Sequence, residues 1–389
     1  MSATSRNIVF AKSDTGGGHR SGAAAIIAAL DSYKNVSCPI IDLLRVTDFP
    51  LLRQAPEIYD YCSKNVLWLN NFFFRKTNSV DRIKALTRMV FFRSGRRIEE
   101  QLANSRPDAV VAVHPLVIGL LQQARLKSGA TWPIITVVTD LVTIHASWAT
   151  PGADLYLVPT RDAYESVKKY GVPDSRIIHT GFPVHPKFTN GRSTRLQARR
   201  DLGLDPERFT VLFTSGGVGA GNMNQWISTL VEKCRDKQLL VVTGNNKQLY
   251  SELRRQSTDN ERIKVYGFVD NMETLMTASD VIVSKAGPGT IMEGIATGRP
   301  LIITEAVGIQ ESGNIDYIQK NQLGCYCPSP EEACAIINRM SQVAPEQAAA
   351  GRGAADAGGA DRIAATVLEY INEVTLRQGD KPADVFRGA

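Results

Sequence analysis

The chain has 389 residues, of which 43% are hydrophobic and 22% are charged, and this composition excludes a disordered or collagen-like protein. Because a single core stops growing at about 250 to 300 residues, the length predicts two domains. The net charge is +6, and residues 1–190 hold 23 Lys and Arg against 15 Asp and Glu. We therefore expect the first half to meet an anionic partner, either a membrane surface, a nucleic acid or an acidic substrate.

Short β-branched runs alternate with helical runs along most of the chain. This alternation predicts an α/β protein in which parallel sheets are connected by crossover helices. Two series of such runs, each opening with a strand and a glycine turn, indicate two doubly wound domains. The strand-like runs are NIVFA, DAVVAV, PIITVVTD and DLYLVPT in the first half, and FTVLFTSGG, QLLVVTG, IKVYGF, DVIVSKAG and PLIIT in the second.

A polar, turn-rich stretch between the two series, HPKFTNGRSTRLQARRDLGLDPERF, predicts a domain boundary near Phe188. We expect one domain over residues 1–187 and a second over residues 188–389. Near the end of the chain, the low-complexity stretch PEQAAAGRGAADAGGAD precedes a helix from Arg362 to Leu376. That helix is amphipathic enough to dock, and the N-terminal domain is one place for it.

Glycines follow the first strand of each half. Gly16, Gly17 and Gly18 precede His19, and a second cluster, SGGVGAGN, runs from Ser215 to Asn222. Such turns let a ligand approach the backbone and the free N–H groups of a helix N-terminus, although a plain tight connection is the ordinary alternative. Neither cluster fits a P-loop, and neither fits the nicotinamide-binding fingerprint cleanly.

His19 is placed at the carboxyl edge of the first strand, where open α/β sheets bind ligands. A histidine with a near-neutral pKa can accept a proton from a hydroxyl group there. A helix-capping or surface histidine is the alternative interpretation.

The strongest functional signal is the run DVIVSKAGPGTIMEGIATGRPLIITEAVGIQESGN. Its turn at residues 286–290 lies at a predicted helix N-terminus and suits a phosphate group. Glu293, one turn into that helix, can accept hydrogen bonds from two hydroxyl groups, as on a ribose. Gln310, Glu311 and Asn314 follow the next strand at the same edge. Structural duties could account for any one of these residues but explain the whole set poorly, so together they indicate a site for a phosphate group and a ribose.

Several motifs of this chain occur together, in the same order, in a known family. TGGGHRSGA, VHPL, VVTDLVTIHASW, TGFPVHPKF, KAGPGTIMEG and GIQESGN resemble those of the monogalactosyldiacylglycerol synthases and processive diacylglycerol glucosyltransferases. More distantly they resemble the N-acetylglucosaminyltransferase that makes lipid II. The resemblance extends from about Asn7 to Tyr326. It implies a GT-B type fold, with two Rossmann-like doubly wound domains, one for the acceptor and one for the nucleotide sugar, facing across a cleft.

The activity that the resemblance implies is an inverting transfer of galactose or glucose from a UDP-sugar to the free hydroxyl of 1,2-diacylglycerol. His19 would be the general base, and Asp140 would orient either His19 or the acceptor, a choice that the sequence leaves open. Residues implied for the nucleotide sugar are Gly217, Val218, Gly219, Phe268, Gly287, Pro288, Gly289, Thr290, Glu293, Gln310, Glu311 and Asn314. Those implied for the acceptor are Gly17, Gly18, His114, His145 and Trp148.

We expect no cofactor and no metal, because the chain holds no D-x-D pair, and backbone N–H groups and helix dipoles would stabilise the leaving diphosphate. One position departs from the family: His185 stands where an arginine is usual, which leaves its role open.

The segment Val66–Arg97 mixes aromatic residues with eight Lys and Arg and one Asp. This pattern fits a helix lying on anionic lipid, although it also fits ordinary core or RNA binding. Since a diacylglycerol acceptor lies in a bilayer, the resemblance favours the membrane and no nucleic acid. The residues expected at the membrane are Trp68, Phe72, Phe73, Phe74, Arg75 and Lys76.

The expected location is cytoplasmic, peripheral on the inner face of the cell membrane. The cysteines lack C-x-x-C spacing, no secretory segment opens the chain, and no apolar run reaches the roughly 18 to 20 residues that span a bilayer. Three alternatives stay open: a lipid II-type transferase, a nucleotide-sugar 2-epimerase, and a non-catalytic UDP-sugar sensor.

Overall fold

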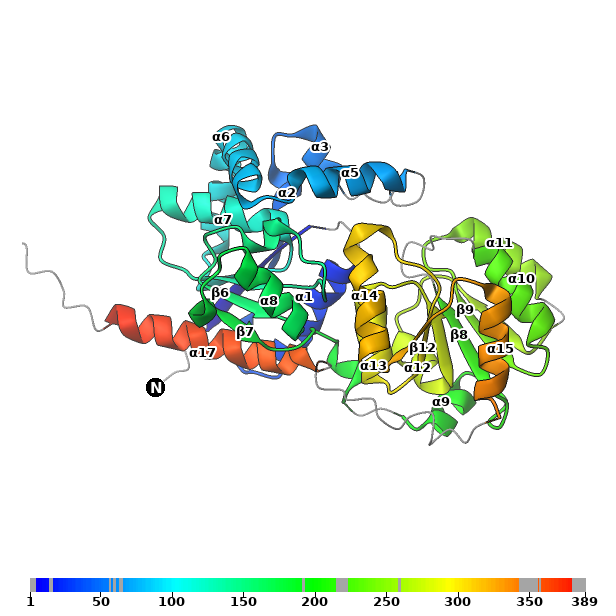
Figure 1. The fold of residues 1–389 in the computed structure, drawn as a ribbon. Helices are drawn as coiled ribbons and strands as arrows, with labels where there is room; N and C mark the ends of the chain where they lie inside the picture. Colours follow the sequence, from blue (N-terminus) through cyan, green and yellow to red (C-terminus); the bar gives the residue numbers. More distant parts are fainter. Residues whose placement is uncertain are drawn as a thin grey trace, which may run out of the picture.

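The computed structural model describes residues 5–13, 17–55, 57–58, 61–62, 66–190, 193–214, 223–257, 260–342, 356 and 358–379. These residues form two α/β domains that lie side by side, each built on one parallel sheet with helices on both faces (Figure 1). The predicted α/β class with two doubly wound domains is confirmed.

The N-terminal sheet has the strand order β2-β1-β4-β5-β6-β7, and β3 also pairs with β1. Alternate residues of β1 face opposite ways: Ile8 and Phe10 pack toward α1, while Val9 and Ala11 pack toward α6 and α7. The strands are β1 (Arg6–Lys12), β2 (Val36–Ser37), β3 (Ile40–Asp42), β4 (Ala109–Ala112), β5 (Ile134–Val137), β6 (Leu155–Val158) and β7 (Ile177–His179). The helices are α1 (Gly17–Leu30), α2 (Leu43–Val46), α3 (Pro50–Arg53), α5 (Leu67–Thr77), α6 (Val80–Ser105), α7 (Pro115–Ser128), η1 (Ala146–Ala149), α8 (Arg161–Lys169), η2 (Asp174–Arg176) and η3 (Pro186–Phe188).

The C-terminal sheet has the order β10-β9-β8-β11-β12-β13, which is the order of a dinucleotide-binding fold. Its strands are β8 (Thr210–Thr214), β9 (Gln238–Val242), β10 (Ile263–Tyr266), β11 (Val281–Ser284), β12 (Leu301–Ile303) and β13 (Gly324–Tyr326). Its helices are α9 (Arg195–Asp201), α10 (Met223–Lys233), α11 (Lys247–Gln256), α12 (Met272–Ala278), α13 (Pro288–Ala296), α14 (Gly308–Lys320) and α15 (Pro330–Met340).

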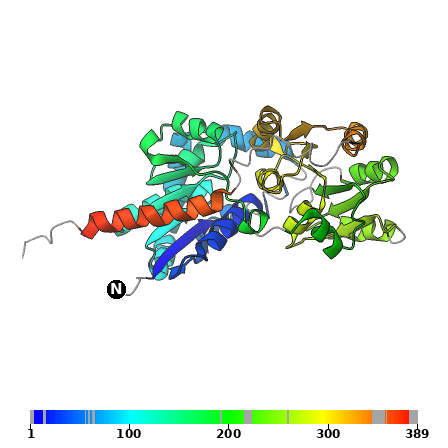
Figure 2. The same ribbon diagram turned by 90° about the horizontal axis from the view of Figure 1, so that it is seen from below.

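The last helix, α17 (Gly359–Gly379), lies against the N-terminal domain, beside α1 (Figures 1 and 2). Its residues Ile363, Ala364 and Val367 are fully buried in the same core cluster as β1 and α1. The chain therefore crosses between the domains twice. It enters the C-terminal domain before residue 188, since Phe182 and Val184 already pack in that core, and it returns to the N-terminal domain with α17.

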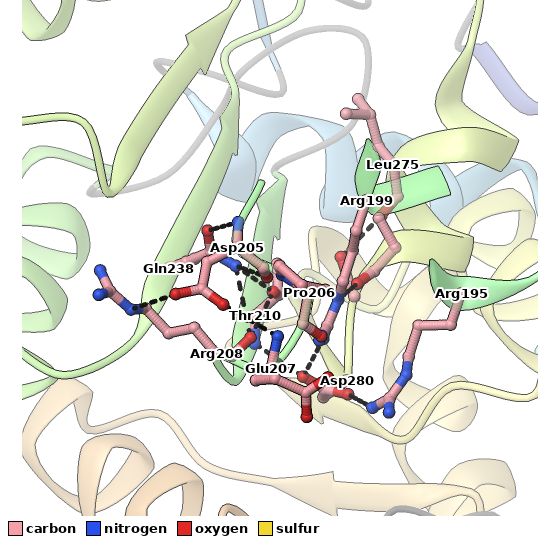
Figure 3. A network of polar contacts seen from close by, with 12 residues as sticks. Arg195, Arg199, Asp205, Pro206, Glu207, Arg208, Thr210, Gln238, Leu275 and Asp280 are labelled. Atoms are coloured by element: carbon pink, nitrogen blue, oxygen red, sulfur yellow. Dashed lines mark hydrogen bonds and ion pairs between the residues drawn. The ribbon is translucent and has the colours of Figure 1, made fainter. Parts of the chain in front are cut away.

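A polar network fixes α9, the first helix of the second half, to the C-terminal sheet (Figure 3). Arg199 of α9 is buried and donates to Asp280 Oδ2 over 2.5 Å, while Arg195 reaches Asp280 Oδ1 over 2.5 Å. The Thr210 N–H at the start of β8 also donates to Asp280, over 2.7 Å. This network lies at the amino ends of β8 and β11, so it stabilises the domain and leaves the opposite sheet edge for a ligand.

None of the helices in the described ranges is long and apolar enough to cross a membrane. Apolar side chains are nevertheless exposed on α3, α5 and α6 and between them. They include Leu51, Tyr61, Trp68, Phe72, Phe73, Met89 and Phe92, of which Phe92 is 89% exposed.

Candidate active site

The carboxyl edges of the two sheets face one another across a cavity of about 1120 Å³. In each domain the strand order reverses at this edge, between β1 and β4 in one and between β8 and β11 in the other. Open α/β sheets bind ligands at such reversal points. The cavity therefore joins the two places where ligands are expected.

His19 stands on the first turn of α1, directly after the reversal point of the N-terminal sheet. Its Nδ1 atom lies 2.8 Å from Thr139 Oγ1, at the end of β5. Desolvation by burial lowers the pKa of His19 to about 4, and a hydrogen bond with the Val113 backbone opposes this shift. The imidazole is therefore neutral at neutral pH and is able to accept a proton.

His114 packs edge-on against His19, with 4.8 Å between ring centroids. It is the N-cap of α7, where its Nδ1 accepts a hydrogen bond from the Leu116 N–H over 3.3 Å. Burial, and then the neighbouring His19, hold the pKa of His114 well below its usual value. His114 thus forms a neutral wall behind the His19 ring.

Asp140 is not bonded to His19 by any contact between described residues. Its Oδ2 accepts a hydrogen bond from Trp148 Nε1 over 2.6 Å, and its Oδ1 accepts one from Gln310 Nε2 over 3.0 Å. Burial raises the pKa of Asp140, while these two hydrogen bonds oppose the shift. The sequence left open whether Asp140 orients His19 or the acceptor. Its contacts do not support the first of these roles.

Trp148 differs from the expectation that it contacts an acceptor. Its side chain is 0% exposed and does not line the cavity, because the indole is packed beneath Asp140. Trp148 therefore supports two residues that do line the cavity, Asp140 through this hydrogen bond and His19 through a ring contact at 5.8 Å between centroids.

His145 does line the cavity and joins the wall to α5. Its Nε2 lies 3.2 Å from the Phe74 carbonyl oxygen, and its ring meets the Phe74 ring at 4.8 Å between centroids. Burial lowers the pKa of His145.

On the C-terminal wall, the turn after β11 leads into α13 with Gly287 as the N-cap. Pro288 occupies the first turn, where a missing N–H costs nothing, and the N–H groups of Gly289 and Thr290 stay free of helix partners. Lys285 Nζ contacts Glu311 Oε1 over 2.6 Å beside this turn. The sequence prediction assigned no role to Lys285, although a cation directly before a phosphate turn was a signal for one.

Glu293 lies one turn further along α13 and also lines the cavity. Its carboxylate has no hydrogen-bond partner within the part of the chain that the structure describes. Burial raises the pKa of Glu293 to about 7, with Lys187 opposing the shift and Glu273 adding to it. Lys187 Nζ itself pairs with Glu273 over 2.9 Å. Lys187 is a second cation of the site that the sequence prediction missed.

His185 lines the cavity next to Lys187. Its Nδ1 accepts a hydrogen bond from the Lys187 N–H over 3.2 Å, and burial, followed by the Lys187 charge, lowers its pKa. A neutral His185 thus holds the turn that carries Lys187 into the cavity.

The cavity brings most of the predicted residues together. Those that line it are Gly17, Gly18, His19, Phe73, Phe74, His114, Asp140, His145, Phe268, Gly287, Pro288, Gly289, Thr290, Glu293, Gln310, Glu311 and Asn314. Trp68, Phe72, Arg75 and Lys76 lie on α5 outside it, and Gly217, Val218 and Gly219 fall outside the described residues. Within the described ranges, no group of three or more His, Cys, Asp and Glu residues is placed to hold a metal ion.

One end of the cavity is apolar. Leu51, Leu52, Ala55, Ile58, Leu69 and Phe73 line it there, from α3 to α5. Two of these lining residues, Leu51 and Phe73, are themselves exposed on the surface of the protein.

Comparison with known proteins gives two family matches. Residues 19–184 match the model of monogalactosyldiacylglycerol (MGDG) synthase, and residues 210–313 match the glycosyltransferase family 28 C-terminal domain. Monogalactosyldiacylglycerol synthase 1, chloroplastic, of Arabidopsis thaliana is 32% identical over 349 residues, which are 85% of this chain and 64% of that protein. Synthase 2 of the same plant is 30% identical over 351 residues, covering 85% and 73%. The chain thus spans about 64% of the length of the first relative.

Among solved structures, the crystal structure of Acinetobacter baumannii MurG aligns with 94% of this chain and 99% of that one, at a TM-score of 0.60 and 13% identity. This likeness concerns the fold alone, and it confirms the predicted GT-B type.

Proposed function

Because the chain belongs to the monogalactosyldiacylglycerol synthase family, we propose that it transfers galactose from UDP-galactose to the free hydroxyl of 1,2-diacylglycerol. One observation supports this function most directly. The neutral imidazole of His19 and the carboxylate of Glu293, which has no hydrogen-bond partner among the described residues, lie on the two domain walls of one cavity. The same cavity has an apolar end and a phosphate-type turn.

In the proposed reaction the hydroxyl oxygen of diacylglycerol attacks the anomeric carbon of the sugar. The new bond joins that oxygen to the anomeric carbon, the bond from this carbon to the diphosphate oxygen breaks, and UDP leaves with the electron pair. His19 takes the hydroxyl proton as general base. Because the oxygen attacks in one displacement from the side opposite the leaving diphosphate, the configuration at the anomeric carbon inverts. The N–H groups at the start of α13 and the cations of Lys285 and Lys187 stabilise the charge on the leaving diphosphate.

The remaining cavity residues are assigned by their chemistry. Glu293 accepts hydrogen bonds from the ribose hydroxyls, and the backbone near Phe268 holds the uracil. Gln310 and Glu311 face the sugar. The diacylglycerol chains enter through the apolar end while α5 lies on an anionic membrane surface, so the protein is peripheral on a membrane. The proposed chemistry uses no metal ion.

An assay of purified protein tests this function. UDP-galactose and UDP-glucose are each offered with diacylglycerol in mixed micelles, and the anomeric configuration of the product is determined. We expect transfer from UDP-galactose with inversion. Transfer only to a polyprenyl-diphosphate acceptor would instead identify a lipid II-type enzyme, and conversion of the sugar without an acceptor an epimerase.

The variant His19→Ala separates an enzyme from a sensor. We expect transfer to fall at least about 100-fold while UDP binding is retained. The control is His179→Ala, because His179 pairs with Asp356 over 3.0 Å and does not line the cavity. Turnover by His19→Ala equal to that of His179→Ala would remove His19 from the reaction.

A further inference from the structure

The first turn of α14 is held by a residue from the other domain. The N-cap of α14, Val307, provides no side-chain hydrogen bond to the helix. Instead the Ile309 N–H donates to Asn71 Oδ1 over 3.0 Å, and these residues are 238 positions apart. Asparagine is among the preferred residues for capping a helix N-terminus, and here Asn71 does so from α5.

The geometry at Gly308 shows how closely α5 approaches. Gly308 has φ of +76°, and a Cβ atom there would lie 3.0 Å from Asn71 Oδ1 and 3.6 Å from a Leu67 methyl carbon. The start of α14 therefore has both a left-handed backbone and little room for a side chain against α5. Figure 1 shows α5 reaching over the end of α14.

Two further contacts hold the same helix from the N-terminal domain. Gln310 donates to Asp140, and Gly313 packs so tightly that a Cβ atom would lie 2.7 Å from Thr143 Oγ1. The first half of α14 is thus positioned by the N-terminal domain at three successive places.

The same turn organises the donor wall of the cavity. Glu311 Oε2 accepts a hydrogen bond from the Val307 N–H over 2.9 Å, and Glu311 Oε1 contacts Lys285 Nζ. Lys285 in turn lies next to Gly287, since a Cβ atom on Gly287 would be 3.6 Å from its Nζ. A shift of the first turn of α14 would therefore move Glu311, and with it the cation beside the phosphate turn.

The other side of α5 is exposed. Trp68 and Phe72, spaced four residues apart, are 69% and 47% exposed, and Lys76 lies over the Phe72 ring at 5.7 Å. Asn71 and Phe74, three residues apart, point instead to α14 and His145. One short helix therefore meets both the expected membrane surface and the donor wall.

We propose that Asn71 is a positioning residue that caps α14 from the opposite domain, so that the membrane-facing helix α5 completes the donor site. This inference rests on the proposed function, in which the C-terminal wall binds UDP and α5 contacts the membrane. Membrane contact and UDP binding then favour the same placement of α5, and linkage requires each to strengthen the other.

The test uses the full chain with Asn71→Ala, Asn71→Asp and the control Asn321→Ala. Asp keeps an acceptor at the helix N-terminus, whereas Ala removes it. Asn321 is an asparagine at the other end of α14, where its Nδ2 donates to the Tyr317 carbonyl over 2.8 Å. Thermal unfolding of each variant first establishes that it is folded.

Two readouts follow. Hydrogen exchange of the ligand-free protein should speed up about tenfold over residues 308–314 in Asn71→Ala, with Asn71→Asp and Asn321→Ala close to the parent. Titration with UDP should show affinity about threefold to tenfold weaker in Asn71→Ala alone. Anionic vesicles should tighten UDP binding to the parent protein but not to Asn71→Ala.

Parent-like exchange and UDP affinity in Asn71→Ala would overturn the inference while leaving the proposed function intact. Failure of the parent protein to bind UDP would instead count against the proposed function, and the exchange experiment would still decide whether Asn71 holds α14. Equal losses in Asn71→Ala and Asn71→Asp would also overturn the capping role.

Discussion

Gln310 Nε2 and Asp140 Oδ1 lie 3.0 Å apart and join the two domains by a hydrogen bond at the wall of the cavity. Asp140 is only 5% exposed, and its second oxygen is occupied by Trp148. The amide of Gln310 is thus a donor that a buried carboxyl group needs, in addition to any contact that it makes with a sugar.

We predict that Gln310→Glu separates the domains. A second carboxyl group at this place would repel Asp140 or force one of the two to hold a proton. Transfer should fall at least about tenfold, and small-angle X-ray scattering of the ligand-free protein should give a larger radius of gyration. Gln319→Glu, at an exposed position of the same helix, is the control. Identical scattering for the two variants would contradict this prediction.

Replacing Trp148 by Phe should destabilise the protein without a direct effect on acceptor binding. The change removes the N–H that satisfies Asp140 Oδ2 and leaves a void in a fully buried site. The expected loss in free energy of unfolding is about 2 to 4 kcal/mol, measured by urea denaturation. Trp226→Phe is a suitable comparison, because Trp226 is 8% exposed and packs against Phe213. A normal stability together with a raised KM for diacylglycerol would restore the acceptor role expected from the sequence.

The sequence was sufficient to predict the position of a site residue where a strand, a turn and a helix follow one another directly. His19 after the first strand, and Gly287 to Glu293 after β11, each belong to such a unit, and parallel sheets bring the carboxyl ends of their strands to one edge. The prediction that the two sheet edges face one another across a cleft came from the family resemblance.

The contacts between distant segments were not predictable in this way. Asn71 and Ile309 are 238 residues apart, and no pattern in the sequence around Asn71 predicts a contact with α14. Trp148 was predicted to bind the acceptor and does not line the cavity. A tryptophan in a loop motif is equally able to line a cavity or to pack behind its wall. Only the packing under Asp140 distinguishes these cases.

Binding to vesicles should depend on both the aromatic and the cationic residues of α5. Phe73 is 56% exposed and Arg75 is exposed beside it. The double variant Phe73→Ala, Arg75→Ala should co-sediment less with vesicles that contain anionic lipid, since each basic residue near such a surface contributes about 1 kcal/mol. Binding of the parent should also weaken as salt is added.

The control for this experiment is Tyr33→Ala, Lys34→Ala, an exposed aromatic and cationic pair just beyond the C-terminal end of α1, outside the cavity. Co-sedimentation that is indifferent to salt and to anionic lipid, or an equal loss in both double variants, would refute a specific contact through α5.

The ionisation of Glu293 should control donor binding near neutral pH. Its pKa is raised to about 7 by burial, and only the ionised carboxylate can accept hydrogen bonds from two hydroxyl groups. The affinity for UDP-galactose should therefore be highest above about pH 8 and fall up to tenfold for each unit below about pH 7. UDP-galactose is preferred to UDP for this titration because its diphosphate carries a constant charge over this range.

Two variants assign this pH dependence to Glu293. Glu293→Gln should bind weakly with a flat profile, and Lys187→Ala should move the midpoint to higher pH, because Lys187 opposes the rise in the pKa of Glu293. The same shift has a consequence for the ligand-free protein: the folded state keeps a proton that the unfolded state releases at its ordinary value of 4.5, so stability should decline as pH rises from there to about 7. Bound donor offsets this decline, since its hydroxyl groups satisfy the ionised form. A flat binding profile for the parent, measured by calorimetry, would mean that the Glu293 carboxylate does not hold the ribose.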